Sequence, residues 1–98
     1  MVTTDDVLTV LRQVIDPELG INIVDLGLVY DVTVNDSNVN IDMTMTTPAC
    51  PIAGTLTQQA EMVILRAFSD VRAVTIELVW EPEWNPMMMS WEARAVFG

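Results

Sequence analysis

The sequence predicts a small α+β domain, a two-layer sandwich in which helices cover one face of a sheet. Two segments carry apolar residues at helical spacing, and they flank a stretch in which apolar and polar residues alternate one by one. A third alternating segment follows the second helical one. The expected order is therefore helix, strand, strand, helix, strand and a tail with a short helix, which can bury the apolar sides of helices and sheet together.

Length and charge limit what the chain can do. Its 98 residues are expected to form one domain, residues 1–98, and 51% of them are hydrophobic. The net charge is −10, with 4 arginines and no lysine, so neither nucleic acid nor a membrane surface is an expected partner. A single cysteine forms no internal disulfide, and no apolar run could span a bilayer, so a cytoplasmic location is expected.

The first helix is expected to begin at Thr3 or Thr4. A hydroxyl would cap it, and Asp5 and Asp6 would face the positive end of its dipole. Its apolar side is formed by Val7, Leu8, Val10, Leu11, Val14 and Ile15. Asp16-Pro17 ends the helix, because a residue before proline avoids helical geometry, and a loop follows.

Two strands are expected next, over Leu28–Val34 and Val39–Thr46. Both alternate apolar and polar residues, and the short polar segment 35–37 between them is typical of a turn. Such a pair forms an antiparallel hairpin. We expect the first strand to be central in the sheet, with both neighbours antiparallel to it.

The second helix is expected to begin at Pro51, because proline suits the first helical position. One face of it is apolar: Ile52, Leu56, Ala60, Val63, Ile64, Ala67 and Phe68. A third strand is expected over Val74–Trp80. The prolines of the tail interrupt regular structure, and Ser90 is expected to cap a last short helix through Phe97.

Cys50 is the strongest candidate for a chemical role, because it is the only cysteine in a chain without histidine. At the start of a helix its thiolate would be stabilised, which suits a nucleophile or a soft-metal ligand. Thr46 and Thr47 would then be nearby hydrogen-bond donors. A lone cysteine more often packs as a small hydrophobe, and the residues alone favour that role.

The composition narrows the chemistry of Cys50. Without a second cysteine or a histidine, the chain has no CxxC redox pair and no Cys–His nucleophile pair. One thiolate completes neither a zinc site nor an iron–sulfur cluster site. Further metal ligands would come from carboxylates, a partner protein or a second copy of the chain.

Three acidic residues, Asp16, Glu18 and Asp25, lie between the first helix and the first strand. They could act as hard metal ligands or as a general base beside Cys50. The alternative is local, since aspartates commonly hydrogen-bond the amides of turns and strand ends, and for each residue alone this is the favoured role.

The last twenty residues concentrate large soft side chains. Trp80, Trp84, Trp91 and the methionines at 87–89 are of types enriched at adaptable interfaces. Alternatively, the tail folds back and caps the sheet, and both roles can hold at once.

Four motifs, taken together and in this order, resemble the metal–sulfur cluster biosynthesis family, which has PaaD-like and SufT-like members. They are Asp16-Pro17-Glu18, Asp25-Leu26-Gly27-Leu28-Val29, Thr46-x-x-x-Cys50-Pro51 and Trp80-x-Pro82-x-Trp84-x-Pro86. The ending from Ser90 to Gly98 is also similar, so the resemblance covers essentially the whole chain.

The resemblance implies an iron–sulfur-assembly-domain fold and an accessory, non-enzymatic role in maturing iron–sulfur proteins. The family's cysteine falls on Cys50 and its loop acids fall on Asp16, Glu18 and Asp25. The oxygenase-associated PaaD-like branch carries a cysteine-rich C-terminal extension. The present chain ends at Gly98 without one, which favours the SufT-like form.

The leading hypothesis is a factor for cluster assembly or transfer, with Cys50 as a thiolate ligand for a transiently bound iron–sulfur cluster or iron. The ligand set would be shared across a homodimer or with a carrier or client protein. The alternative is an interaction module that binds no metal and supports the maturation of a multicomponent oxygenase or another metalloenzyme. An enzyme with Cys50 as nucleophile and Asp16 or Asp25 as base ranks last.

Overall fold

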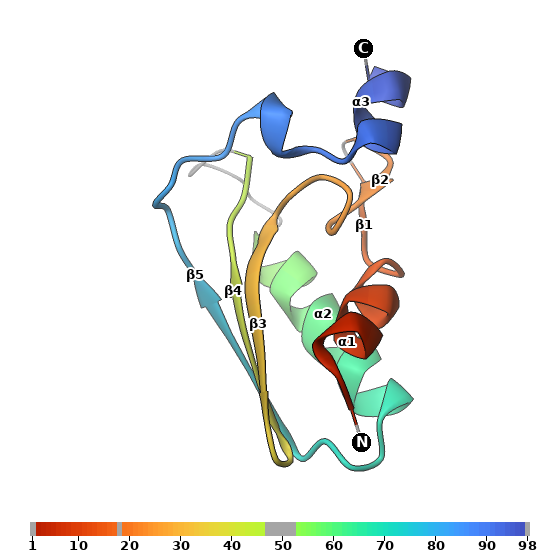
Figure 1. The fold of residues 1–98 in the computed structure, drawn as a ribbon, viewed down its shortest axis with the longest axis vertical. Helices are drawn as coiled ribbons and strands as arrows, with labels where there is room; N and C mark the ends of the chain where they lie inside the picture. The colour runs from red at the N-terminus through yellow and green to blue at the C-terminus, as the bar shows by residue number, and fades with distance from the viewer. Residues whose placement is uncertain (1, 18, 47–52, 98) are drawn as a thin grey trace.

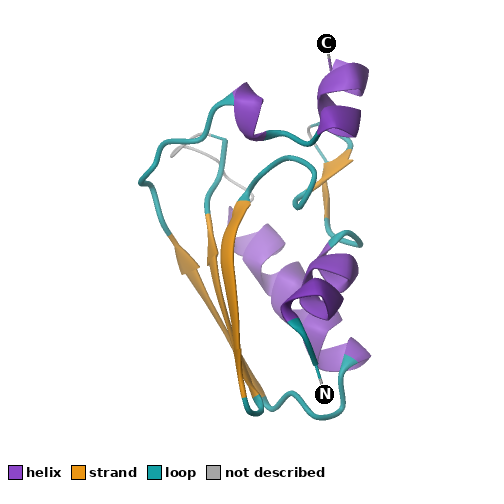
Figure 2. Ribbon diagram, in the orientation of Figure 1, coloured by secondary structure: helices purple, strands orange, loops and turns teal. Residues whose placement is uncertain are grey.

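The computed structural model describes residues 2–17, 19–46 and 53–97, which form two helices against a three-stranded sheet and a C-terminal cap (Figure 1). Figure 2 shows the same elements by type, and they confirm the expected α+β class. In chain order they are α1 (Thr4–Leu11), β1 (Ile15–Asp16), β2 (Ile21–Asn22), β3 (Val29–Asn35), β4 (Asn38–Met43), α2 (Ala53–Ala67), β5 (Ala73–Leu78), the 3-10 helix η1 (Pro86–Met88) and α3 (Trp91–Phe97).

Helix α1 begins as expected, with a reciprocal cap. The Asp6 amide donates to Thr3 Oγ1 at 3.1 Å and the Thr3 amide donates to Asp6 Oδ2 at 3.0 Å. The expected C-terminal end is wrong, because the helix stops at Leu11. From Val14 onward, burial alternates from one residue to the next, as in a strand. Val14 is buried, Ile15 is 46% exposed and Asp16 is 4% exposed.

The segment that was expected to be a loop contains a short hairpin. Strands β1 and β2 pair antiparallel, with Ile15 opposite Asn22 and Asp16 opposite Ile21. This hairpin was not predicted, because strands of two residues are too short to produce an alternating pattern.

The main sheet confirms the hairpin and corrects the strand order. Strands β3 and β4 pair antiparallel around a turn in which Asp36 has a φ of 55°. The order is β3-β4-β5, so β4 is central rather than β3, and β5 runs parallel to β4. Helix α2 is the reason: it carries the chain back along the sheet, and a strand–helix–strand unit places its strands in parallel.

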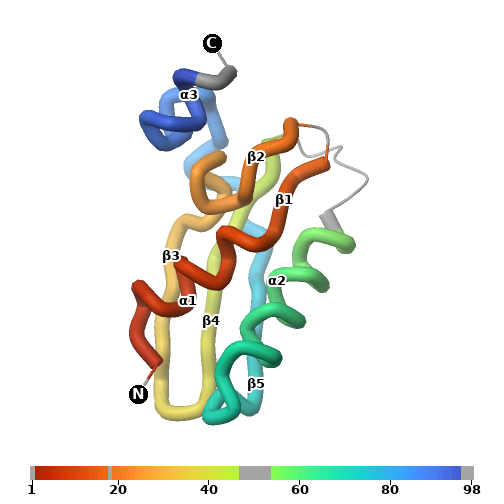
Figure 3. Tube along the Cα trace, turned by 90° about the vertical axis from the view of Figure 1, so that its right-hand side faces the viewer, coloured from red at the N-terminus to blue at the C-terminus, as the bar shows by residue number. Residues whose placement is uncertain are grey.

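Both long helices cover the same face of the sheet, as Figure 3 shows. The core between the layers consists of buried apolar side chains from α1 (Val7, Leu11), α2 (Leu56, Ala60, Ile64), β4 (Val39, Ile41, Met43) and the segment before β3 (Ile23, Leu26, Leu28). The opposite face is polar, and the pairing register places Asp42 beside both Asp31 and Glu77. Within the described part of the chain, no helix is long and apolar enough to cross a membrane.

Candidate functional site

Three segments meet at the end of the molecule opposite the N-terminus: the segment joining β2 to β3, the carboxyl end of β4, and the C-terminal tail (Figure 1). All four motifs identified in the sequence contribute residues to these segments or to the adjoining β1–β2 hairpin. Ligands commonly bind beyond the carboxyl ends of parallel strands, and β4 and β5 both end here.

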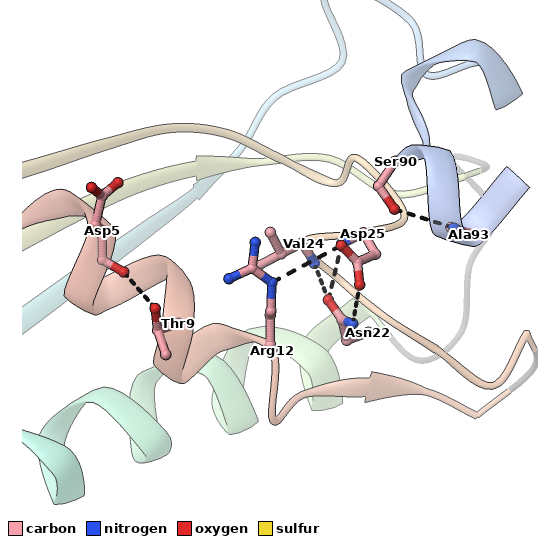
Figure 4. A network of polar contacts seen from close by, with 8 residues as sticks. All are labelled: Asp5, Thr9, Arg12, Asn22, Val24, Asp25, Ser90 and Ala93. Atoms are coloured by element: carbon pink, nitrogen blue, oxygen red, sulfur yellow. Dashed lines mark hydrogen bonds and ion pairs between the residues drawn. The ribbon is translucent and has the colours of Figure 1, made fainter.

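Asp25 belongs to a local network around Asn22 (Figure 4). The Asn22 side chain accepts the amides of Val24 at 3.1 Å and Asp25 at 2.9 Å, and donates to Asp25 Oδ2 at 2.7 Å. The other carboxylate oxygen, Oδ1, lies 4.0 Å from Arg12 Nε. Both oxygens of Asp25 are therefore engaged within the fold, which favours the local role over that of a metal ligand or a base.

Asp16 is the most buried acidic residue that the structure describes, with 4% of its surface exposed. Its carbonyl oxygen accepts the Gly20 amide at 2.7 Å, which closes the turn between β1 and β2. Since β2 also contains Asn22, the hairpin places Asp16 and the Asp25 network in one structural unit.

The C-terminal tail folds back onto the segment before β3, as one of the two alternatives predicted. Trp84 Nε1 donates to the Leu26 carbonyl at 2.8 Å, and the Ser90 amide donates to the Asp25 carbonyl at 2.7 Å. Met89 is buried in the core. Ser90 caps α3 as expected, because its Oγ accepts the Ala93 amide at 3.2 Å.

Tyr30 links β3 to the same tail. Its hydroxyl donates to the Pro82 carbonyl at 2.7 Å and lies 3.4 Å from Met88 Sδ. Burial raises the pKa of Tyr30 above its usual 10.0, and a hydrogen bond with Thr44 partly opposes this effect. The phenol is therefore a neutral, structural group at physiological pH.

A cavity of about 270 Å³ lies between the end of β4 and the tail. Its lining is mixed, with hydroxyl, carboxylate and indole groups from Thr44, Met45, Thr46, Trp80, Glu81, Glu83 and Trp84. Thr46 is thus one of the residues that line this mixed, concave surface.

The other predicted site residues, Glu18, Thr47 and Cys50, lie outside the described residues. Within residues 2–17, 19–46 and 53–97, no group of three or more His, Cys, Asp or Glu side chains could hold a metal ion. Asn22 and the two glutamates of the cavity were not predicted as site residues. The spacing Asn22-x-x-Asp25 is a turn signal that could have indicated the first of these.

Comparison with known families gives a match over most of the chain. A family model described as "Iron-sulfur cluster assembly protein" matches residues 4–78. This range includes both hairpins, Cys50 and the three loop acids Asp16, Glu18 and Asp25. It ends with strand β5, just before Glu81 and Glu83.

Individual relatives match over nearly their full length. An Fe-S protein maturation auxiliary factor of Porphyromonas gingivalis is 42% identical over 97 residues, covering 98% of this chain and 91% of the relative. The Fe-S protein maturation auxiliary factor SufT of Staphylococcus aureus is 43% identical over 87 residues, covering 88% and 98%. A crystal structure of a domain of unknown function from Bacillus anthracis superposes with a TM-score of 0.93 at 40% identity, covering 96% and 90%.

Proposed function

Because this chain belongs to the iron–sulfur cluster assembly protein family, we propose that it is an auxiliary factor that assists the assembly of iron–sulfur clusters or their transfer to client proteins. The observation that carries the proposal is the full-length similarity to relatives that are named as maturation auxiliary factors. The proposed role is accessory rather than catalytic. The protein is proposed to act as one domain over residues 1–98 and to work in the cytoplasm.

Cys50 is proposed as the thiolate that contacts the iron or cluster cargo. A cluster normally takes four protein ligands, and the sequence contains one cysteine and no histidine. The remaining ligands are therefore proposed to come from another chain, either a second copy in a homodimer or a carrier or client protein. Two copies would supply two thiolates, and partner side chains would complete the set.

The test is anaerobic reconstitution of the purified protein with iron and sulfide, comparing wild type with Cys50→Ala. We expect bound iron and a sulfur-to-iron absorption band in wild type, and loss of both in the variant, because Cys50 is the only thiol in the sequence. Thr75→Ala, on the exposed face of β5, is the matched control and should bind iron as wild type does.

Sedimentation of the same samples tests how the ligands are shared. A cargo held between two copies should convert wild type, but not Cys50→Ala, from monomer to dimer on reconstitution. If wild type and Cys50→Ala bind equally little iron, the direct role of Cys50 in holding cargo is wrong.

A second candidate function is supported by the exposed side of the tail. Met87 and Trp91 are 73% and 77% exposed, although both are large and apolar. The Arg94 guanidinium lies 5.8 Å from the centre of the Trp91 ring, and its Nη1 lies 3.8 Å from Met87 Sδ. Tryptophan, arginine and methionine are the residue types enriched at protein interfaces, which supports an interaction module that recognises a partner without binding metal.

The double variant Met87→Ser/Trp91→Ala separates this candidate from the first. Truncating an interface tryptophan commonly costs about 2 kcal/mol of binding, so the variant should bind its partner about thirty-fold more weakly. Expressed in a bacterium that lacks its own homologue, it should restore correspondingly less activity of an iron–sulfur enzyme than wild type. If the interaction module alone accounts for the function, Cys50→Ala should restore full activity in the same cells, whereas a cargo role of Cys50 predicts loss of activity. Normal activity of the double variant at equal protein level contradicts the interaction module.

A further inference from the structure

The cavity at the end of β4 combines groups that together recognise an organic cation. Glu81 and Glu83 bring two carboxylates to its wall, and Trp80 and Trp84 bring two indoles. Both glutamates are exposed, and neither carboxylate has an ion-pair or hydrogen-bond partner among the residues that the structure describes. The negative charge at the cavity is therefore not balanced from within the described part of the fold.

The N–H group of the Trp84 indole is already engaged within the fold. Trp84 Nε1 already donates to the Leu26 carbonyl at 2.8 Å, which fixes that side chain in the wall. Trp80 is 41% exposed and lines the same cavity. An ammonium or guanidinium group is attracted to the face of an indole, most strongly when carboxylates flank the site.

The size and the chemistry of the lining favour a single basic side chain over other ligand classes. At about 270 Å³ the cavity is smaller than those that enclose cofactors or drug-sized molecules, and it suits one side chain. Two carboxylates repel an anion. Indoles are not metal ligands, and the described residues contain no group of three metal-binding side chains.

The cation has to come from another molecule. The chain has no lysine, and none of its 4 arginines lines the cavity. Arg12 faces Asp25, Arg94 lies over Trp91, and the Arg72 amide donates to the Ser37 carbonyl beside the β3–β4 turn, at the other end of the sheet. A net charge of −10 further favours a basic partner surface.

We propose that this cavity receives an arginine or lysine side chain of a partner protein, with the carboxylates of Glu81 and Glu83 around the cation and the Trp80 ring against it. The inference specifies how the proposed auxiliary factor binds its partner protein. It rests on the proposed function only for the identity of that partner as an iron–sulfur carrier or client protein. A basic side chain bound here would fix the partner beside Thr46, four residues before Cys50 in the sequence.

The probe is a capped tripeptide, acetyl-Gly-Arg-Gly-amide, titrated into iron-free protein that carries Trp91→Phe. In that background the indole fluorescence comes from Trp80 and Trp84, the two that line the cavity. We expect a saturable change that the corresponding lysine peptide reproduces and a glutamate peptide does not. Glu81→Gln and Glu83→Gln should each weaken binding by about five-fold, the upper range for one exposed ion pair.

Glu77→Gln is the matched control, because Glu77 is an exposed carboxylate of β5 that does not line the cavity. It should leave the affinity unchanged. The proposal is overturned if no saturable change occurs, if Glu77→Gln weakens binding as much as the cavity variants do, or if magnesium ions displace the peptide at equal concentration.

A second copy of the chain is the remaining alternative occupant. If wild type forms dimers in sedimentation experiments and Glu81→Gln/Glu83→Gln abolishes them, an arginine of a second copy fills the cavity, and the assignment to a different protein is overturned. Since all these measurements use iron-free protein, their failure leaves the proposed cargo role of Cys50 intact, and failure of the reconstitution leaves this inference intact.

Discussion

Gly27→Ala is expected to destabilise the fold by about 2–5 kcal/mol, the largest effect among the glycines that the structure describes. Gly27 has a φ of +80°, a conformation that costs a residue with a Cβ about 1–2 kcal/mol. A Cβ built there would lie 2.7 Å from the carbonyl carbon of Met88 and 2.9 Å from its Cβ. The clash adds about 1–3 kcal/mol, because the obstructing atoms include backbone that cannot rotate away.

Thermal unfolding measures this effect, and two other glycines provide matched controls. Gly20 has a φ of +69° but nothing within 4 Å of a built Cβ, so Gly20→Ala should cost only about 1 kcal/mol. Gly54, in the first turn of α2, also has open space, and Gly54→Ala should stabilise the protein by about 0.5–1 kcal/mol. Equal losses of unfolding free energy for Gly27→Ala and Gly20→Ala would show that the Met88 backbone does not crowd position 27.

The same glycine explains part of what the sequence could not predict. Its place in the Asp25-Leu26-Gly27 motif is local information, but the reason that only glycine fits is the backbone of Met88, which is 61 positions later by residue number. Trp84 and Leu26 are 58 positions apart. Contacts of this kind leave no period in the sequence, so the docking of the tail could only be anticipated as one of two alternatives.

Local patterns, in contrast, gave correct predictions. The alternation from Val39 onward identified β4, and the helical spacing around Ala60 identified α2, because each pattern extends over several turns or residue pairs. The errors arose where a local pattern was ambiguous or absent. Val14 and Ile15 fit a helical stripe as well as a short strand, and the central position of β4 depends on where α2 returns the chain.

The candidate site could be predicted only in part, because it is formed by segments that are distant in the sequence. Asp25 was predicted as a site neighbour from its motif, and its engagement by Asn22 and Arg12 favours a structural role. The cavity glutamates were not predicted, because Glu81 and Glu83 become notable only when the fold brings them to the same cavity as Thr44 and Thr46. Convergence of segments that are distant in sequence, rather than the residue types alone, defines this site.

Trp84→Ala is expected to cost about 3 kcal/mol of stability, because a partly buried indole packed against the core would be lost. Its hydrogen bond to the Leu26 carbonyl would be lost as well. Trp84→Phe retains most of the packing and should cost about 1 kcal/mol, the usual net value of one hydrogen bond. Denaturant unfolding, followed by the far-ultraviolet circular dichroism signal, measures both changes without relying on tryptophan fluorescence.

Trp91→Ala is the matched control for Trp84→Ala, since it removes the same side chain from a site that is 77% exposed. It should change the free energy of unfolding by no more than about 0.5 kcal/mol. The contrast also determines how the interaction surface has to be tested. Deleting the tail from Trp84 onward would remove the side chains of Trp84 and Met89 that pack in the core, whereas Met87 and Trp91 are exposed and can be changed without disturbing it. Equal losses for the two tryptophans would contradict a docked tail with one buried and one exposed indole.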